Sequence, residues 1–323
     1  MTDLTQQILA ALPKPNRVMA PVRWYGGKGH MARKLVPLIP PGRVYCEPYC
    51  GAASLFWHLR PRPVEVLNDL HSEIVNLFRT LQDPALFDEL AHRLAWTPYS
   101  LAEFRKALGM EYAEELSAVD RAWAFFVRQN QGFSGIAETE GNWGRDFGSG
   151  CGMAKTTSDW RSRLATLGWW HERLTRVQLD CRDALEVIRY WDSPETVYYV
   201  DPPYAADTRA KGKHNVYRHE ADDEHHRALV ALLLGIQGNA VVSGYASPLY
   251  ASLDAAGWTR HEFQTACCAA GRCRGSKIRG DDAAREHVPR TEVVWIKRPV
   301  QQFLGEMFDP TDTGKPTDGQ DQN

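Results

Sequence analysis

The chain lacks several features that would assign it quickly to a class of protein. It has no apolar run long enough to cross a bilayer, and its first residues do not form a basic-then-apolar secretory signal. We therefore expect a globular, cytoplasmic protein with no membrane partner. The seven cysteines are odd in number and include no Cys-x-x-Cys pair, which favours reduced thiols. We predict no metal, and the weaker alternative is a zinc site with ligands from Cys267, Cys268, Cys273 and either His261 or His287.

Two nucleotide-binding patterns are also missing. The Gly-x-x-x-x-Gly-Lys-Ser/Thr loop is absent, and so is the Gly-x-Gly-x-x-Gly fingerprint, which counts against a dehydrogenase. A net charge of −2 argues against polyanion binding over the whole surface but permits a local basic face. The cations do cluster in two segments, for which a solvated loop is the alternative interpretation. They are Arg209, Lys211, Lys213 and Arg218, and then Arg272, Arg274, Lys277, Arg279, Arg285 and Arg290.

What is present indicates a large α/β body with an insertion. With 323 residues, 43% of them hydrophobic, the chain can bury a sizeable core. Strand-like runs alternate with helical patterns, which predicts a mostly parallel sheet. The expected strands are 44–46, 64–67, 177–179, 197–200, 240–243 and 293–297. The expected helices are 4–12, 31–38, 86–94, 101–108, 118–129 and a Trp-rich helix that includes Trp160, Trp169 and Trp170.

The long interval between the second and third strands predicts the domain organisation. It far exceeds an ordinary crossover, so we expect an inserted, mainly helical domain at 85–175. Its loop at 130–152 is rich in Gly, Asn and aromatic residues and suits a recognition surface, although a purely stabilising cap is the alternative. The remaining boundaries are an extension at 1–20, a discontinuous body at 21–84 and 176–303, and a polar tail at 304–323 that we expect to be disordered.

The run from Val197 to Tyr204 carries the clearest chemical signal. Four β-branched and aromatic residues suit a buried strand, and Pro202 and Pro203 cannot continue its hydrogen-bonded ladder. Asp201 is therefore expected at the carboxyl edge of the sheet, where open α/β folds bind ligands, with the ring of Tyr204 close by. An ordinary strand-terminating turn is the alternative for these four residues alone.

Other motifs accompany the predicted strand ends. The segment Trp24-Tyr25-Gly26-Gly27-Lys28 combines a flexible turn with a cation, and Glu47-Pro48-Tyr49-Cys50-Gly51 follows the first strand into a small-residue turn and an expected helix. Asn68 and Asp69 end the second strand and suit a ribose or another polar part of a nucleoside, and Asp183 follows the third. Helix capping is the alternative explanation for any one of these acids, but four successive strand ends that carry Glu47, Asp69, Asp183 and Asp201 favour a shared site.

With these motifs in this order, the chain resembles the Dam-like, class alpha group of adenine-specific DNA methyltransferases over about residues 22–300. The matching elements are Trp24 to Lys28, Glu47 to Gly51, Asn68-Asp69, Asp201-Pro202-Pro203-Tyr204 and Ser243-Gly244-Tyr245. The resemblance implies a Rossmann-like seven-stranded sheet, S-adenosylmethionine as methyl donor, and a DNA-recognition domain inserted before the Asp-Pro-Pro-Tyr strand. Body 21–84 and 176–303 would then be the catalytic domain, and 85–175 the target-recognition domain.

The resemblance also implies roles for single residues. The donor contacts would be Trp24, Lys28 near the methionine carboxylate, Glu47 and Gly51 at the methionine end, Asp69 at the adenosine, Asp183 at the adenine, and Asp201 between donor and target base. Ala53 departs from the family by replacing a glycine, and its methyl group could tighten the donor pocket. Gln129 and Ser134 also depart, because they replace the two Asn residues of a family element.

The expected reaction is direct methyl transfer to a flipped adenine. The Asp201 carboxylate and the Pro202 carbonyl would each accept a hydrogen of the amino group, in a motif completed by Pro203 and by Tyr204, on which the base would stack. The loop 205–219 would close over the base and nearby phosphates. The expected DNA contacts are Asn130, Phe133, Arg209, Lys211, Lys213 and Tyr217.

Two other functions stay open on the sequence alone. One is a non-catalytic nucleic-acid-binding module of the same fold, against which the intact Asp201 motif and Lys28 argue. The other is transfer to the amino group of cytosine, against which Asp rather than Ser at position 201 argues mildly. Double-stranded DNA is the expected partner, and a cognate restriction endonuclease is a candidate partner. The sequence specifies neither the recognition site nor the oligomeric state.

Overall fold

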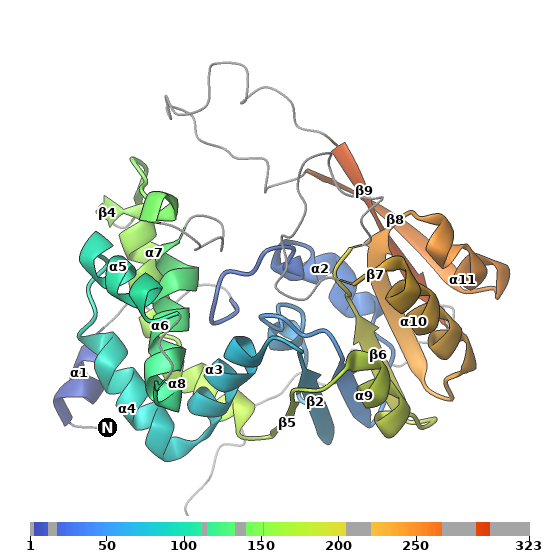
Figure 1. Cartoon of the computed structure of the whole chain (residues 1–323), viewed down its shortest axis with the longest axis horizontal. Helices are drawn as coiled ribbons and strands as arrows, with labels where there is room; N and C mark the ends of the chain where they lie inside the picture. Colours follow the sequence, from blue (N-terminus) through green and yellow to red (C-terminus); the bar gives the residue numbers. More distant parts are fainter. Residues whose placement is uncertain are drawn as a thin grey trace, which may run out of the picture.

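The structure, a computed structural model, describes residues 3–11, 18–111, 115–132, 140–150, 152–204, 221–266 and 289–297. These residues form two lobes that lie side by side: a sheet flanked by helices, and a cluster of helices around α6 (Figure 1). The first lobe carries the seven-stranded sheet in the order β5-β2-β1-β6-β7-β9-β8. The predicted seven-stranded α/β fold is therefore confirmed.

One strand of the sheet, β9, runs against the direction of the other six. From β5 to β7 all neighbours are parallel, whereas β9 is antiparallel to both β7 and β8. The strands are β1 Val44–Glu47, β2 Val64–Asn68, β5 Val177–Asp180, β6 Thr196–Val200, β7 Asn239–Tyr245, β8 Thr259–Ala266 and β9 Pro289–Ile296. A separate antiparallel pair consists of β3 Ser149–Gly150 and β4 Met153–Ala154.

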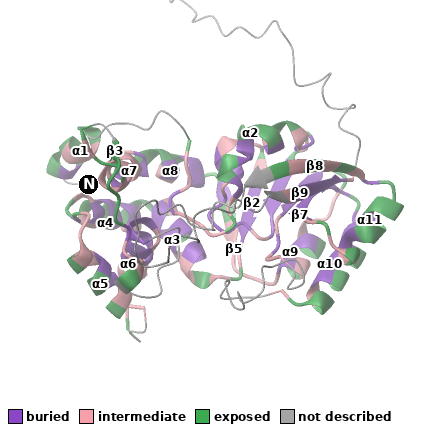
Figure 2. Ribbon diagram, turned by 90° about the horizontal axis from the view of Figure 1, so that it is seen from above, coloured by how far each residue is buried: buried purple, intermediate pink, exposed green. Residues whose placement is uncertain are grey.

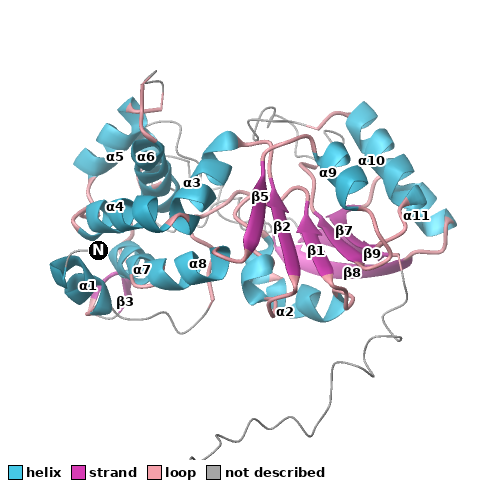
Figure 3. Cartoon of the chain, turned by 90° about the horizontal axis from the view of Figure 1, so that it is seen from below, coloured by secondary structure: helices cyan, strands magenta, loops and turns pink. Residues whose placement is uncertain are grey.

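The two faces of the sheet have different helical cover. Val187 of α9, Leu229 of α10 and Leu253 of α11 pack on one face, and Leu35 of α2 and Ile74 of α3 belong to the core on the other (Figure 3). Side chains alternate between faces along each strand, so a strand buried on both sides must be apolar throughout. All five residues of β6 are buried, and the four from Val197 to Val200 are apolar or aromatic. The strands β7 and β9 are likewise mostly buried (Figure 2).

The helical lobe contains the helices between β2 and β5, joined by α1. Helix α3 packs against α4, α6 and α8 within the helical lobe and against β5 of the sheet, and so connects the two lobes. The helices are α1 Asp3–Ala10, α2 Ala32–Leu35, α3 Ser72–Gln82, α4 Pro84–Ala95, α5 Leu101–Gly109, α6 Ala118–Gln131, α7 Lys155–Leu164, α8 Leu167–Leu174, α9 Ala184–Trp191, α10 Asp223–Gly235 and α11 Ala251–Ala255. Whether 85–175 folds as a separate domain stays a prediction.

Three helix predictions were wrong. The expected helix at 31–38 is divided into α2 and a 3₁₀ turn, because Pro37 has no N–H to continue the α-helical pattern. The Trp-rich helix is two helices, α7 and α8, and at their junction the Thr166 hydroxyl donates to the Ser162 carbonyl. No α-helix follows Gly51, because Gly51 and Ala53 have left-handed φ values of +47° and +53°. Strand β8 was not predicted.

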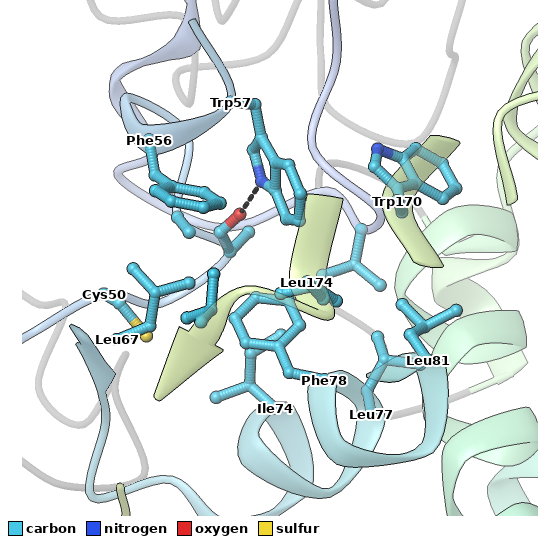
Figure 4. Packing of buried hydrophobic residues seen from close by; sticks show 14 of the residues in the cluster. Cys50, Phe56, Trp57, Leu67, Ile74, Leu77, Phe78, Leu81, Trp170 and Leu174 are labelled. Carbon is cyan, nitrogen blue, oxygen red and sulfur yellow. Dashed lines mark hydrogen bonds between the residues drawn. The ribbon is translucent and has the colours of Figure 1, made fainter. Parts of the chain in front are cut away.

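The turn after Gly51 is held by the core beneath it. The Trp57 indole Nε1 donates to the Ala52 carbonyl oxygen at 2.8 Å, and Phe56 and Trp57 pack above Phe78 of α3 (Figure 4). A short 3₁₀ turn, Phe56–His58, supplies both rings. The apolar anchor fixes a turn that leads from the end of β1 across the edge of the sheet.

The described part of the chain has neither a membrane-spanning helix nor a metal-binding cluster. None of its helices is long and apolar enough to span a membrane. Within the same ranges, no three His, Cys, Asp or Glu side chains are placed to hold a metal ion. Cys267, Cys268, Cys273 and His287 of the alternative zinc site lie outside the described residues.

Candidate active site at the sheet edge

The carboxyl ends of the parallel strands bring the predicted acids to one edge of the sheet. Glu47 is the last residue of β1, Asp69 follows β2, and Asp201 follows β6. Strands β2 and β6 both pair in parallel with β1, which places these three ends side by side. Lys28 reaches the same edge from the short 3₁₀ turn that precedes α2.

Lys28 and Asp201 form an ion pair in which the lysine is buried and the aspartate side chain is 18% exposed. The Lys28 Nζ lies 2.6 Å from Asp201 Oδ1 and 2.9 Å from Oδ2, and the lysine side chain is only 4% exposed. A third group, Glu292 of β9, places its Oε1 3.5 Å from the same Nζ. Lys28 and Asp201 were both predicted site residues. The carboxylate of Glu292 joins them only through the fold.

The charges of Lys28, Asp201 and Glu292 shift the pKa values of Asp201 and Lys28. Burial raises the pKa of Asp201 to about 6; Lys28 opposes this rise and Glu292 adds to it. Burial alone would lower the pKa of Lys28, but the carboxylates of Asp201 and Glu292 outweigh it and raise the pKa well above its usual value. Lys28 therefore stays charged, while Asp201 can change charge close to physiological pH.

Tyr204 is fixed at both ends of its side chain. Its hydroxyl donates to Glu292 Oε1 at 2.7 Å, and its ring lies 4.4 Å from that of Tyr245, tilted by 48°. The Lys28 Nζ lies 4.8 Å from the centre of the Tyr204 ring. Burial, followed by the charge of Asp201, raises the pKa of Tyr204, so its hydroxyl keeps its proton. The ring therefore has a defined orientation beside Asp201.

Glu47 is a buried carboxyl with an unusual pKa. It is 2% exposed, and its Oε1 accepts a 2.6 Å hydrogen bond from the Tyr45 hydroxyl. Burial raises the pKa of Glu47 to about 8; the hydrogen bond from Tyr45 opposes this rise, and the charge of Asp201 adds to it. The carboxyl is mostly protonated at pH 7 and could ionise beside a cationic group.

Asp69 holds the turn that follows β1. Its Oδ2 accepts from the Gly51 amide at 2.7 Å, and its Oδ1 accepts from the His71 amide at 2.8 Å. The Trp24 indole lies against Gly51, where a Cβ would come within 2.4 Å of Trp24 Nε1. Trp24 also meets the ring of Phe125 of α6 edge-on. The expected donor residues Trp24 and Asp69, from two other segments, thus both contact the turn at Gly51.

The other two polar strand-end residues have structural partners. Asp183 Oδ1 accepts from the Leu185 and Glu186 amides and caps α9, which is the helix-cap role considered above. Asn68 is fully buried, and its amide bonds to the Pro48 carbonyl and to both backbone groups of Arg182. Asn68 therefore positions two neighbouring turns, and a nucleoside contact of the Asn68-Asp69 pair stays a prediction.

Most of the expected DNA contacts cannot be located. Phe133, Arg209, Lys211, Lys213 and Tyr217 lie outside the described residues. Asn130 is described and is 2% exposed; its Nδ2 donates to the Pro21 carbonyl at 3.0 Å, so it joins α6 to the segment before Trp24. Phe147 was not among the predicted DNA contacts. Its side chain is fully exposed, and Arg145, two residues earlier in the chain, is also exposed.

Glu292 is the site residue that the sequence pattern did not single out. It lies directly before the predicted strand 293–297 and belongs to the longer observed strand β9, in which Val293, Val294, Trp295 and Ile296 are all buried. The signal was an acid directly before four apolar residues. Its partner was not readable, because only the antiparallel direction of β9 brings its first half to the edge where the parallel strands end.

Comparisons with known proteins find similarity to DNA adenine methyltransferases. A family model described as D12 class N6 adenine-specific DNA methyltransferase matches residues 24–265. The chain is 27% identical over 220 residues to a DNA N-6-adenine-methyltransferase of Escherichia phage P1, covering 65% of this chain and 27% of that protein. It is 24% identical over 187 residues to a DNA adenine methylase of Vibrio cholerae serotype O1, covering 57% of this chain and 64% of the relative.

A shorter match extends the same set of relatives. A Type II methyltransferase of Lactococcus lactis subsp. cremoris is 27% identical over 118 residues, which is 35% of this chain and 41% of the relative. The matched segments thus span about a quarter of the phage protein and just under two thirds of the Vibrio protein.

Proposed function

Because the chain belongs to the D12 class of N6 adenine-specific DNA methyltransferases, we propose that it transfers a methyl group from S-adenosylmethionine to the exocyclic amino group of adenine in duplex DNA. The observation that carries this proposal is the partly exposed Asp201 at the end of β6, held by the buried Lys28 beside the oriented ring of Tyr204. An acceptor and a stacking surface next to each other are what a flipped amino base requires.

The residues present fit the proposed donor. Glu47, Asp69 and Asp201 provide carboxylate acceptors along one edge of the sheet, which suit an ammonium group and ribose hydroxyls. When bound, this donor supplies an electrophilic methyl group on a sulfonium. We assign Trp24, Lys28, Gly51 and Asp183 to the same binding site by position; Lys28 would then act on both the donor end and Asp201.

The chain's own part in the reaction is to orient the amino group and take up a proton. Lys28 fixes the plane of the Asp201 carboxylate while leaving lone pairs on both oxygens. Asp201 and the Pro202 carbonyl would accept the two amino hydrogens and aim the nitrogen lone pair at the methyl group. With a pKa of about 6, Asp201 could also receive the proton that the methylated nitrogen releases.

The remaining partners follow from this activity. Duplex DNA is the proposed substrate, and base stacking of about 1–3 kcal/mol on Tyr204 would offset much of the cost of flipping. One relative is named a Type II methyltransferase, which keeps a cognate restriction endonuclease as a candidate partner. We expect the protein to act in the cytoplasm.

Labelled methyl transfer tests the proposal. The protein is incubated with S-adenosylmethionine carrying a labelled methyl group and with duplex DNA, the DNA is hydrolysed, and the modified base is identified. We expect label on adenine and a loss of about a hundredfold or more in turnover for Asp201→Ala. Asp223→Ala, an exposed site on α10, is the control. Label on cytosine, no label, or normal turnover of Asp201→Ala would reject the assignment.

The salt dependence of DNA binding distinguishes contacts to phosphates from contacts made by an aromatic ring. Neutralising Arg209, Lys211 and Lys213 together should flatten the logarithmic salt dependence of DNA binding by about 0.9 for each phosphate that the protein no longer neutralises. Phe147→Ala is the matched comparison: removal of an exposed aromatic ring should weaken binding with the slope unchanged. Affinity measured by fluorescence anisotropy over a series of salt concentrations gives both slopes, and an unaltered slope in the triple variant contradicts the loop assignment.

A further inference from the structure

Strand β9 brings one acid to the active-site edge from the opposite direction. Because β9 runs antiparallel to β7, its Glu292 lies across from Tyr245, at the end of β7, and across from Phe263 of β8. Glu292 is 3% exposed, within a strand whose next four residues are apolar and buried. A buried acid in such a strand needs compensating partners.

Among the described residues, the partners of Glu292 are all donors, and they converge on one oxygen. Its Oε1 accepts from the Tyr204 hydroxyl at 2.7 Å and from the Ser243 hydroxyl at 2.9 Å, and the Lys28 ammonium lies 3.5 Å away. An ionised carboxylate only accepts hydrogen bonds, so this arrangement suits a charged Glu292. It also connects Tyr204 to Lys28, which in turn holds Asp201.

The charges in this buried group do not cancel. Asp201 and Glu292 contribute two negative charges and Lys28 one positive charge, which leaves one unit of negative charge when both acids are ionised. Buried charges are costly unless something pairs with them. The excess matches one monovalent cation, and a sulfonium is such a cation, whereas its demethylated thioether is neutral.

We propose that Glu292 is a positioning residue that orients Tyr204 and gives the site its net negative charge, so that the site favours the sulfonium donor over the neutral thioether product. This inference rests on the proposed function. Glu292 would then have two roles. It would hold the Tyr204 ring beside the target base, and its charge would make the sulfonium donor bind more tightly than the thioether product.

A second consequence concerns Asp201. Glu292 competes for the Lys28 ammonium and lies close enough to raise the pKa of Asp201. Without the Glu292 charge, Lys28 would neutralise Asp201 more completely. The Asp201 carboxylate would then ionise at a lower pH, and the acid limb of activity would move to lower pH with it.

Binding and pH profiles together test the role of Glu292. Dissociation constants for S-adenosylmethionine and S-adenosylhomocysteine are measured by calorimetry for the wild type, Glu292→Gln and Glu292→Met. We expect both variants to shift the ratio of the two constants by about tenfold against the sulfonium, the size expected for one nearby charge at intermediate dielectric. The acid limb of kcat/KM should also move to lower pH.

Controls separate charge at this site from charge and contacts elsewhere. Glu262→Gln removes an exposed acid from the neighbouring strand and should leave the ratio unchanged. Ser243→Ala removes one hydrogen bond to Glu292 but no charge, and should also preserve the ratio. Tyr204→Phe should lower kcat with little effect on the ratio.

The outcomes are distinct. If Glu292→Gln and Glu292→Met fold but keep both the ratio and the acid limb of the wild type, the inference is wrong. If neither variant folds, as read by circular dichroism and thermal melting, Glu292 belongs to the architecture and the inference is equally overturned. If the wild type binds neither compound and labels no DNA, the proposed function itself fails, which differs from failure of the inference alone.

Discussion

Ala53 shows how a single residue can depart from its family for a backbone reason. Its φ of +53° is the left-handed conformation, which costs a residue with a side chain about 1–2 kcal/mol and glycine nothing. This explains why the group has glycine at the position. The sequence suggested that the methyl group narrows the donor pocket, but the conformation of the backbone accounts for the preference without that effect.

Replacing Ala53 by glycine should therefore be nearly neutral. Relief of the left-handed strain offsets the lost burial of one methyl group, about 0.8 kcal/mol, and the greater freedom of glycine in the unfolded chain. Ala52→Gly is the matched control, because Ala52 is equally buried and has a negative φ. Urea unfolding should show Ala52→Gly to be less stable than Ala53→Gly by about 1–2 kcal/mol. Equal losses would show that strain is not stored at Ala53.

Glu47 predicts a pH-dependent difference in stability. Its pKa is about 8 in the folded protein and close to 4.5 when unfolded, so between these values the folded state holds a proton that the unfolded chain has lost. The contribution of Glu47 to stability therefore decreases as the pH rises from about 4.5 to 8. Glu47→Gln does not titrate, so its melting temperature relative to the wild type should increase from pH 5 to pH 9.

The control for Glu47 is an exposed acid on the same sheet. Glu262→Gln, on β8, removes a carboxyl that is half exposed. Melting temperatures of both variants and the wild type are compared at pH 5, 7 and 9 in one buffer system. A Glu47→Gln difference that does not grow with pH, or that Glu262→Gln reproduces, would show that burial of Glu47 is not its cause.

At the scale of elements, the turn between β1 and the Phe56–His58 segment is the most constrained part of the site. Gly51→Ala should strongly weaken donor binding and lower stability, because the new Cβ would collide with the Trp24 indole and the residue would keep a φ of +47°. Gly257→Ala is the matched control: Gly257 has a φ of +80°, but nothing lies within 4 Å of its Cβ position. It therefore shows the backbone cost alone.

Calorimetry and thermal melting separate the two costs at Gly51. We expect Gly257→Ala to lose about 1–2 kcal/mol of stability and to bind the donor normally. Gly51→Ala should lose more and should also raise the donor Kd by at least tenfold, because Trp24 must move. A Gly51→Ala protein with normal donor affinity would remove Trp24 and Gly51 from the proposed binding site.

The elements also show what a sequence can and cannot predict. The strands 197–200 and 240–243 were predictable because β-branched and aromatic runs suit only a strand buried on both faces. The pairing of Lys28 with Asp201 was not predictable from spacing, since 173 positions separate them. They meet only because the fold places the turn of Lys28 at the carboxyl end of β6. Glu292 was harder still, because its place depends on the direction of β9.

At the scale of the whole molecule, residues 19–21 link the helical lobe to the active site. Three successive carbonyls accept from three helices: Met19 from Trp170 of α8, Ala20 from Arg163 of α7, and Pro21 from Asn130 of α6. The segment then runs directly into Trp24. These three bonds thus attach the helical lobe to the segment that leads to Trp24 and Lys28.

Asn130→Ala tests this link. Loss of the bond to Pro21 should cost about 1–3 kcal/mol of stability and weaken donor binding severalfold, with the methylated DNA sequence unchanged. Asn76→Ala removes a similar amide bond, to the Ala118 carbonyl, without touching residues 19–21. Chemical unfolding should show similar losses for both variants, whereas only Asn130→Ala should affect the donor Kd. A change in the methylated sequence would instead return Asn130 to the DNA interface.

The antiparallel ladder of β9 also determines where this protein can change length. The ladder with β8 begins where Ala266 meets Pro289, so insertions or deletions within 267–288 leave the pairing of Glu292 with Tyr245 as it is. A single deletion inside β9 has the opposite effect, because a shift of one residue turns every side chain to the other face of the sheet. Val293 would then take the place of Glu292 beside Lys28. The eight residues of β9 must therefore keep their number for Glu292 to stay beside Lys28.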